Sequence, residues 1–219
     1  MDGIIIRMAA KSDVAFLVET IIEAEKSGTD KLSYSTVFGL SEKESRKYLT
    51  EMLLEEVDGC EISISSFIVA EKEGKAIAAV SAWIEGIEGI PSKILKGNLL
   101  NFILPKDSIE RATQLNHILH ELHMEYLPGS IQKGAGYVLD KYRGNNLLGL
   151  LTDEIIKRLL AIKPAVKEVF TQIYGSNFRA INANKKIGFK IVLTKESDNK
   201  VISLYLPSTN KVMMKKELY

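Results

Sequence analysis

The sequence predicts a single α/β domain in which a sheet is flanked by helices. Strand-like apolar runs alternate with amphipathic helical segments along the chain, which is typical of this class. A tight turn at Gly74 joins two neighbouring strand patterns, and the 46% hydrophobic and 26% charged content is that of an ordinary globular protein. The 219 residues are enough for one large core without a metal or disulfide. We therefore expect residues 1–219 to form one domain.

The N-terminal part of the chain predicts one strand and two helices. Residues 3–8 are a short β-branched run and are expected to be the first strand. Asp13 then opens a helix whose apolar side chains recur at the spacing of one buried face. Residues 28–39 are polar and are expected to be a loop. Ser41 followed by Glu44 is the pattern of a capping box, so a second helix begins there.

The next part predicts an antiparallel hairpin followed by a stretch that is harder to assign. Residues 66–71 and 76–85 are strand patterns on either side of a turn in which Gly74 supplies a positive φ. Prolines punctuate residues 86–129. The second half of that stretch predicts one helix, which starts at Asp107 and carries an apolar face.

The C-terminal part predicts further strands alternating with two helices. The expected strands are residues 132–139, 166–173, 190–194, 201–206 and 211–218. The expected helices are residues 146–160 and 177–187, and Gly188 stands just beyond the second, where a left-handed residue often ends a helix.

Composition excludes several classes of function. The net charge of +1 argues against nucleic acid or an anionic membrane as the main partner. A single cysteine, Cys60, forms no internal disulfide, and we expect a reduced, cytoplasmic location. No apolar run reaches the roughly 18 residues of a membrane span, and none reads as a signal peptide. His117, His120 and His123 share one short stretch, but the pattern makes no carboxylate or cysteine partner obligatory, so no metal is expected.

One turn has the composition of a phosphate site. The apolar strand ending at residues 137–139 runs into a turn rich in Gly and Asn, and a helix starts directly after it. The first N–H groups of a helix lack partners and carry a partial positive charge, so such a turn can hold a phosphate. Arg143 adds a cation at its edge. A plain strand-to-helix connection has the same composition and remains an alternative.

Four segments, taken in order, resemble the GNAT superfamily of N-acetyltransferases. They are residues 5–13, the hairpin at 67–82, the turn at 142–149, and the stretch from Asn177 to Phe189. Together they cover most of the chain. Residues 86–129 match nothing in the family pattern and are interpreted as an insertion.

The resemblance implies a mixed, mostly antiparallel twisted sheet with two splayed parallel central strands, which here contain Val138 and Ile173. It also implies acetyl-CoA as co-substrate, bound in the gap between these strands. The acceptor amine would attack the acetyl group directly in a ternary complex. The implied acetyl-CoA contacts are Tyr137, Val138 and Leu139 for the pantetheine arm, Arg143, Gly144, Asn145, Asn146, Leu147, Leu148 and Gly149 for the pyrophosphate, and Asn177 on the other side of the arm.

Residues for proton transfer and for the acceptor are less well defined. The family often has a tyrosine that protonates the leaving thiolate, and Asn184 stands at that position. The remaining candidates are Tyr174 as an alternative acid, Glu85 and His123 as bases, and Tyr34 and Phe38 as acceptor contacts.

Three hypotheses follow. The first is an active N-acetyltransferase whose acceptor is a small-molecule or peptide amine. The second is a non-catalytic CoA-binding sensor or interaction module, favoured by Asn146, Leu148 and Asn184 at positions where the family has other residue types. The third is a different nucleotide enzyme. The sequence contains no phosphate-loop motif, which counts against this hypothesis. The insertion is expected to shape the acceptor pocket, a homodimer interface, or both.

Overall fold

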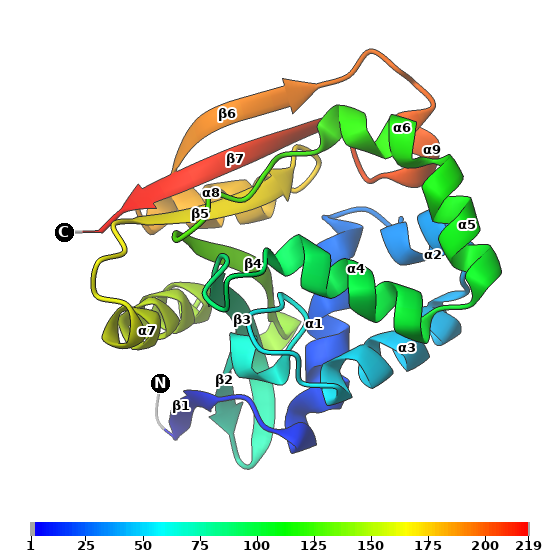
Figure 1. Cartoon of the computed structure of the whole chain (residues 1–219). Helices are drawn as coiled ribbons and strands as arrows, with labels where there is room; N and C mark the ends of the chain where they lie inside the picture. The colour runs from blue at the N-terminus through cyan, green and yellow to red at the C-terminus, as the bar shows by residue number, and fades with distance from the viewer. Residues whose placement is uncertain (1–2, 219) are drawn as a thin grey trace.

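A computed structural model describes residues 3–218 and has a seven-stranded sheet at its centre (Figure 1). The strands are β1 Ile4–Met8, β2 Phe67–Lys72, β3 Lys75–Ile84, β4 Ile131–Val138, β5 Glu168–Tyr174, β6 Lys190–Glu196 and β7 Asn210–Glu217. Their order across the sheet is β1-β2-β3-β4-β5-β7-β6. Only the β4–β5 pair is parallel among these neighbours. The predicted fold class is confirmed.

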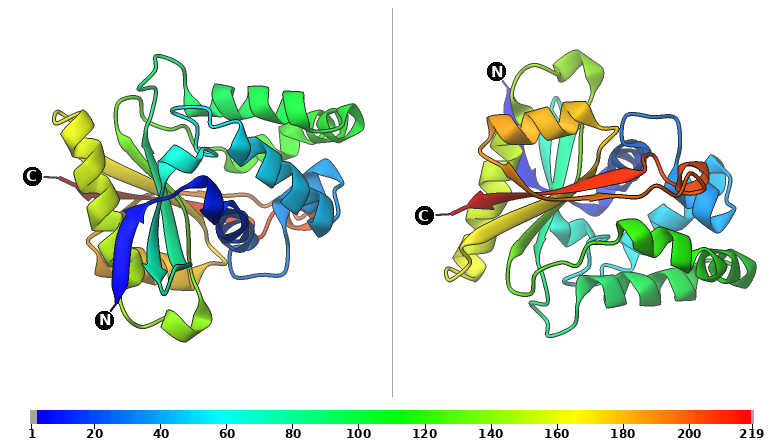
Figure 2. Two further views of the ribbon diagram at one scale, coloured as in Figure 1. Left: turned by 90° about the horizontal axis from the view of Figure 1, so that it is seen from below. Right: turned by 90° about the horizontal axis from the view of Figure 1, so that it is seen from above.

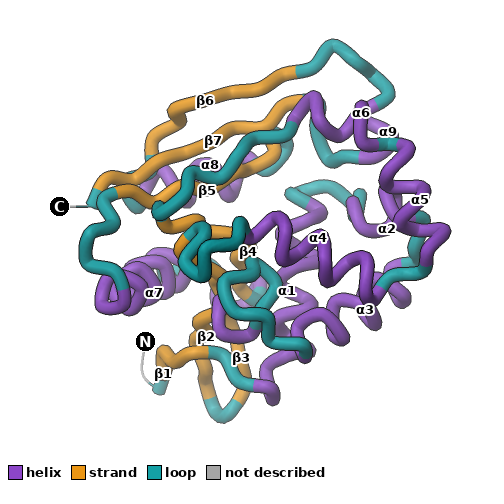
Figure 3. Tube along the Cα trace, viewed as in Figure 1, coloured by secondary structure: helices purple, strands orange, loops and turns teal. Residues whose placement is uncertain are grey.

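Helices cover both faces of the sheet (Figure 2). They are α1 Val14–Lys26, α2 Ser33–Phe38, α3 Glu42–Leu54, α4 Ser92–Ile103, α5 Lys106–Gln114, α6 Asn116–Leu119, α7 Leu147–Ile162, α8 Phe178–Lys186 and α9 Ile202–Tyr205. Buried side chains of α7 and α8 pack on one face of the sheet. Those of α1, α3 and α4 pack on the other face. Figure 3 shows the loops that join the strands to these helices.

Short-range signals in the sequence are confirmed at three places. Ser41 and Glu44 form the capping box that starts α3. The turn between β2 and β3 has φ +74° at Gly74, the left-handed region that glycine enters without steric cost. Gly188 has φ +96° just beyond α8.

The two parallel strands separate partway along their length. β4 and β5 pair only from Ile131–Val169 to Lys133–Thr171. Beyond that point β4 stays with β3 as far as Val138, while β5 stays with β7 as far as Tyr174. The predicted splay is therefore present, and we call this opening the fork.

An irregularity in β4 lies at the vertex of the fork. Three residues of β3, from Val80 to Ala82, face four residues of β4, from Lys133 to Gly136. The extra residue makes a bulge, which bends a strand locally. A Cβ on Gly134 would lie only 2.6 Å from Ser81 Oγ and 2.9 Å from the Trp83 ring, so glycine is required at this bend.

Two local predictions are wrong. Residues 28–39 contain the short helix α2, whose Tyr34 and Val37 are buried. Residues 201–206 contain α9 and no strand, because Ile202 and Leu206, four positions apart, are buried together on one helical face. A short apolar run does not by itself distinguish a strand from a helix.

The 86–129 segment contains α4, α5 and α6, and not one long second-half helix. The helix predicted from Asp107 breaks after Gln114, where Leu115 has φ −85° and ψ −4°, and a short 3-10 turn at residues 120–122 ends it. Figure 1 shows the three helices as an arc that meets the β6–β7 connection. Side chains tie the segment to β5 and β6, since Gln172 Nε2 donates to Met124 O at 3.0 Å and Lys195 Nζ donates to His123 O at 2.6 Å.

Candidate functional site

A cavity of about 500 Å³ opens at the fork and continues toward the 86–129 segment. We call it the fork cleft and distinguish two ends. The fork end is lined by β4, β5, α7 and α8 through Lys133, Gly134, Gly136, Leu148, Thr171, Ile173, Asn177, Ala180, Ala183 and Asn184. The polar end is lined by Glu25, Tyr34, Phe38, Glu61, Trp83, Lys96, His123, Tyr126, Tyr174 and Lys211.

Backbone groups of β4 face the fork at alternate residues. The Leu139 N–H donates to Ile77 O on β3 at 3.0 Å. Because the backbone groups of successive residues in an antiparallel pair face opposite sides, Tyr137 and Leu139 point at β3, while Gly136 and Val138 point into the fork. The expectation that Leu139 offers its N–H to a ligand arm is therefore wrong. Val138 keeps its N–H on the fork side, and its carbonyl accepts from Arg143 Nε at 3.2 Å.

Tyr137 does not line the fork cleft, and its side chain packs beside it. Its ring lies 6.1 Å from the ring of Phe16 on α1, and the Arg143 guanidinium lies 5.9 Å from the Tyr137 ring centre. Arg143 also pairs with Asp140 at 2.7 Å. The strand, the turn and the first helix of the chain are thus held together beside the fork.

The turn before α7 has the geometry of an anion site. Gly144 and Asn146 have positive φ, at 86° and 54°. The N–H of Leu150 donates to Asn146 O at 3.1 Å, so the N–H groups of residues 147–149 precede the first hydrogen bond of the helix. The Asn145 side chain donates to Tyr142 O at 3.1 Å and closes the turn from outside.

The side chains of Asn146 and Leu148 each occupy space next to a glycine that has no side chain of its own. A Cβ on Gly149 would lie 2.5 Å from Asn146 Oδ1, so the asparagine side chain occupies the space that the missing methyl leaves. A Cβ on Gly136 would lie 3.3 Å from Leu148 Cδ2. Leu148 lines the fork cleft without closing it.

The start and end of α8 also reach the fork end. Asn177 caps α8, since its Oδ1 accepts from the Ala180 N–H at 3.0 Å. Asn184 is only 4% exposed and donates from Nδ2 to Ala180 O at 2.9 Å. Within residues 3–218, Asn184 Oδ1 is buried without a hydrogen-bond donor.

Lys133 is a fork-end residue that the sequence did not point to. It lies at the vertex of the fork, is 8% exposed and lines the cleft. No hydrogen bond or ion pair of its side chain is present in the described part of the chain. Burial lowers the pKa of Lys133 to about 8, because it disfavours the ammonium form. In the sequence it is one polar residue inside a strand, and only the splay of β5 turns it into a cleft residue.

Solved structures share this architecture. An N-acetyltransferase from Staphylococcus aureus Mu50 aligns with TM-score 0.65 and 14% identity over 96% of this chain and 99% of its own. An agmatine N-acetyltransferase aligns with TM-score 0.57 and 16% identity over 99% and 100%. A putative acetyltransferase from Salmonella typhimurium, solved with acetyl-CoA, aligns with TM-score 0.51 and 13% identity over 100% and 95%.

The chain has the GNAT fold. No family model matches the sequence, and no curated protein matches it. At these identities the likeness extends to the fold alone, so the GNAT architecture is established by the splayed strands and the order of the sheet.

The polar end of this GNAT fold is built around a partly buried ion pair. Lys96 Nζ donates to Glu61 Oε1, and the Tyr126 hydroxyl donates to Glu61 Oε2 at 3.0 Å. Burial alone would raise the pKa of Glu61, but Lys96 and then Tyr126 outweigh it, so the pKa lies below its usual range. The pKa of Lys96 is raised, because its attraction to Glu61 outweighs its burial.

Aromatic and basic side chains complete the polar end. The rings of Tyr34 and Phe38 stack at 5.8 Å, so both predicted acceptor contacts line the cleft. The Tyr34 hydroxyl is buried with no partner in residues 3–218, and burial raises its pKa. Lys211 Nζ lies 5.4 Å from the centre of the Tyr174 ring. Burial lowers the pKa of Lys211 to about 8 and raises that of Tyr174.

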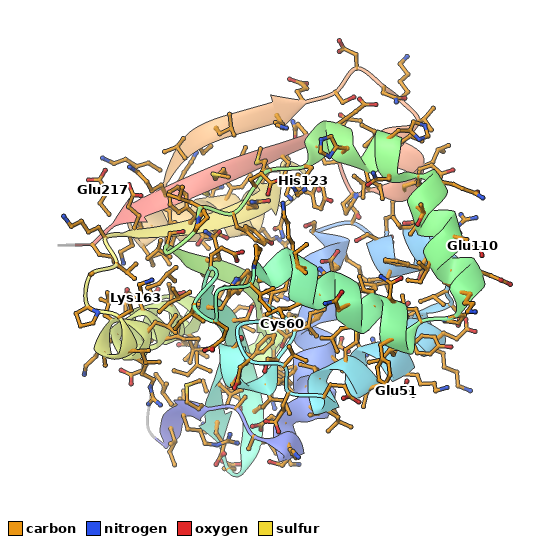
Figure 4. All side chains as sticks on the ribbon, viewed as in Figure 1. Glu51, Cys60, Glu110, His123, Lys163 and Glu217 are labelled. Carbon is orange, nitrogen blue, oxygen red and sulfur yellow. The ribbon has the colours of Figure 1, made fainter. Side chains whose placement is uncertain are left out.

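The predicted proton-transfer residues lie in different places. His123 lines the polar end, and its Nε2 lies 3.0 Å from Glu125 Oε1 (Figure 4). Tyr174 lines the same end and packs toward α2 and α9. Glu85 does not reach the fork cleft.

The Glu85 carboxylate is instead a structural anchor. It accepts from Trp83 Nε1 at 2.9 Å, from the Ser92 hydroxyl at 2.6 Å and from the Ser92 N–H at 3.0 Å. With 3% exposure and three donors, it fixes the start of α4, so we withdraw it as a candidate base.

Across residues 3–218, no group of three or more His, Cys, Asp or Glu is placed to hold a metal ion. Among the described helices, none has the length and apolar character to cross a bilayer.

Proposed function

We propose that this chain is an acetyl-CoA-dependent N-acetyltransferase that acts on a small primary amine. The observation that carries the proposal is the fork cleft, which joins unpaired backbone N–H groups at one end to a polar pocket at the other. The reaction is direct attack of the amine on the acetyl carbonyl in a ternary complex.

The fork end fits acetyl-CoA. The Val138 N–H faces the fork, the N–H groups at the start of α7 form an anion site, and Asn184 Oδ1 is a buried acceptor without a donor. We assign the pantetheine arm to Gly136 and Val138, and the diphosphate to residues 144–149 with Arg143. Acetyl-CoA supplies an activated acyl thioester, and Asn177 lies on the opposite wall.

Backbone N–H groups of β4 serve the chemistry as well as binding. Negative charge develops on the thioester oxygen as the amine attacks. A fixed N–H directed at that oxygen stabilises the transition state more than the ground state. Gly136, the nearer of the two to the closed end, directs its N–H into the fork for this role, and the Val138 N–H faces the arm.

The polar end fits a small amine. It carries two carboxylates, Glu25 and Glu61, of which Glu61 is paired with Lys96. Tyr34, Phe38 and Trp83 provide apolar walls. His123 is the proposed base, because its ring is oriented by Glu125 and lines the cleft beside these groups. The agmatine N-acetyltransferase with the same fold makes polyamine-like acceptors the first to test.

The test is binding followed by turnover. Millimolar acetyl-CoA should raise the melting temperature, because a ligand that binds only the folded state stabilises it. Release of CoA thiol should then follow addition of an acceptor from an amine panel. Absence of any thermal shift would remove the proposal.

A matched pair of glycine variants sharpens this test. Gly136→Val places a side chain against Leu148 inside the fork and should abolish the thermal shift. Gly97→Val, on α4 with open space around its Cα, should leave the shift unchanged. A shift without thiol release for any amine would favour a CoA-binding module, for which Asn184 and the narrowing by Leu148 are the supporting features.

A further inference from the structure

Lys133 occupies the vertex of the fork with its backbone fixed on both sides. It pairs with Ala82 on β3 and with Thr171 on β5, and it is the last β4 residue that pairs with β5. The side chains of Ala82 and Thr171 are both short, so they leave room beside the cleft for the lysine side chain. Its place is therefore set by the sheet and does not depend on a mobile loop.

The Lys133 ammonium has no counter-charge in this place. It is 8% exposed, and within residues 3–218 its side chain makes no ion pair or hydrogen bond. Burying an unpaired charge is unfavourable, and an apolar side chain of similar length would avoid that cost. The structure therefore leaves a buried proton donor at the cleft wall, and no group among residues 3–218 accepts a hydrogen bond from it.

An unpartnered acceptor lines the same end of the cleft. Asn184 on α8 presents a buried Oδ1 that lacks a donor among the described residues. Lys133 and Asn184 both line the fork end. With a ligand in the fork, a lysine ammonium has donors enough for the ligand and for this oxygen.

The thioester must reach the vertex if the proposed function holds. The diphosphate is assigned to the start of α7, next to the open end of β4. An arm that runs back along β4 from Val138 to Lys133 follows five residues of strand, roughly 17 Å at about 3.3 Å per residue. Its sulfur then lies between Gly136 and the closed end of the fork, on the side of Lys133.

We propose that Lys133 is the acid that protonates the departing CoA sulfur, an inference that rests on the proposed function. As the amine nitrogen bonds to the acetyl carbon, the carbon–sulfur bond breaks and its electron pair goes to sulfur. The Lys133 ammonium gives its proton to that sulfur and becomes a neutral amine. The proton lost by the acceptor nitrogen goes to His123, and solvent returns a proton to Lys133 after product release. The products are an N-acetyl amine and CoA thiol.

Other side chains lining the fork end do not offer this proton. Thr171 is an alcohol and Asn177 and Asn184 are amides, none of which is an acid near neutral pH. The titratable groups elsewhere on the cleft wall come from α1, α2, the residues before β2, α4, the end of the 86–129 segment, β5 and β7. They are Glu25, Tyr34, Glu61, Lys96, His123, Tyr126, Tyr174 and Lys211, all at the polar end.

The decisive experiment follows the thiol of bound CoA and needs no acceptor. Free CoA is titrated into the protein across a pH series, and thiolate is read from its ultraviolet absorbance. The wild-type protein should lower the pKa of the bound thiol relative to free CoA, because an ammonium favours a neighbouring thiolate. Lys133→Met should bring it back to the free value or above, and Lys133→Gln serves if the first variant folds poorly.

Lys211→Met is the matched control, since it removes another buried cleft lysine at the polar end. It should leave the thiol titration as in the wild type. With an acceptor, Lys133→Met should lower kcat on the order of 10²-fold. It should also abolish the fall in rate at high pH that deprotonation of the acid produces.

The outcomes separate this proposal from the proposed function. An unchanged thiol titration in Lys133→Met, with CoA bound, overturns the role of Lys133 and leaves the transferase standing. Failure of CoA to bind the wild-type protein overturns both. A Lys133-dependent thiol shift without acetylation of any amine supports contact between Lys133 and sulfur and counts against the transferase.

Discussion

The two ends of the fork cleft are built from different kinds of group, backbone at one end and side chains at the other. The fork end relies on backbone, through the Val138 N–H, the start of α7 and the cap of α8. The polar end relies on side chains, through the Glu61–Lys96 pair, Tyr34 and His123. Backbone sites need only the fold, and solved structures that are about 15% identical share that fold. Side-chain sites have to be supplied by each sequence.

The largest effect should come from a change that damages both ends together. Gly134→Val puts a side chain into Ser81 and Trp83 at the vertex of the fork. We expect a loss of about 3 kcal/mol in the free energy of unfolding, measured by urea titration, because overpacking forces the neighbours apart. The acetyl-CoA thermal shift should also disappear. A stable variant that still binds acetyl-CoA would contradict the account of the bulge.

A change at the polar end should separate chemistry from acetyl-CoA binding. His123→Gln removes the proposed base and should lower kcat by about 10²-fold. The acetyl-CoA thermal shift should stay, since His123 lies at the other end of the cleft. Steady-state kinetics with one acceptor measures the first and calorimetry the second. His117→Gln, in the same segment, is the control that should behave as wild type.

Glu61→Gln should weaken the polar end by leaving the partly buried Lys96 ammonium without its partner. We expect a loss of about 2 kcal/mol in the free energy of unfolding, because an uncompensated buried charge is unfavourable. KM for the acceptor should rise while acetyl-CoA affinity stays the same. Equal losses of affinity for both substrates would mean that the two ends are coupled.

The smallest effect is a pH dependence of stability. Lys133 and Lys211 have pKa values of about 8 in the folded protein, against about 10.4 in an unfolded chain. Between these values the unfolded state binds more protons, so stability should rise as the pH increases from 8 to about 10. Each lysine should contribute about 1 kcal/mol, after allowance for water in the cleft.

Urea unfolding at pH 8 and at about pH 10 tests this rise in stability. Lys211→Met should show a smaller rise than the wild type, and Lys185→Met, on the exposed face of α8, should show the same rise. A wild-type stability that falls over this interval would contradict the assignment.

Local signals account for what the sequence predicted well. The capping box of Ser41, the turn at Gly74 and the cap at Asn177 each act within a few residues, so their residue types suffice to place them. The splay was expected from the family resemblance and is present in the register of β4 and β5.

Features that depend on distant partners were not predictable in this way. Residues 201–206 form a helix because Ile202 and Leu206 pack under the 86–129 segment, which the sequence alone did not place. Glu85 has the sequence position of a strand-end base, but in the structure Ser92 and Trp83 donate hydrogen bonds to its carboxylate. Lys133 gained its position only from the separation of β5. The cytoplasmic location and the homodimer stay predictions.

Trp83 has a consequence for how such a protein can change. Its ring lies where Gly134 has no side chain, and its nitrogen donates to Glu85, which holds the first residue of α4. One indole thus spans the strand bend and the root of the added helices. If the 86–129 segment were exchanged for that of another protein, Glu85 would lose Ser92 and Trp83 would lose its fixed partner, unless residues 83 and 85 were exchanged as well. A change of the 86–129 segment is therefore tied to residues 83 and 85 and does not proceed one side chain at a time.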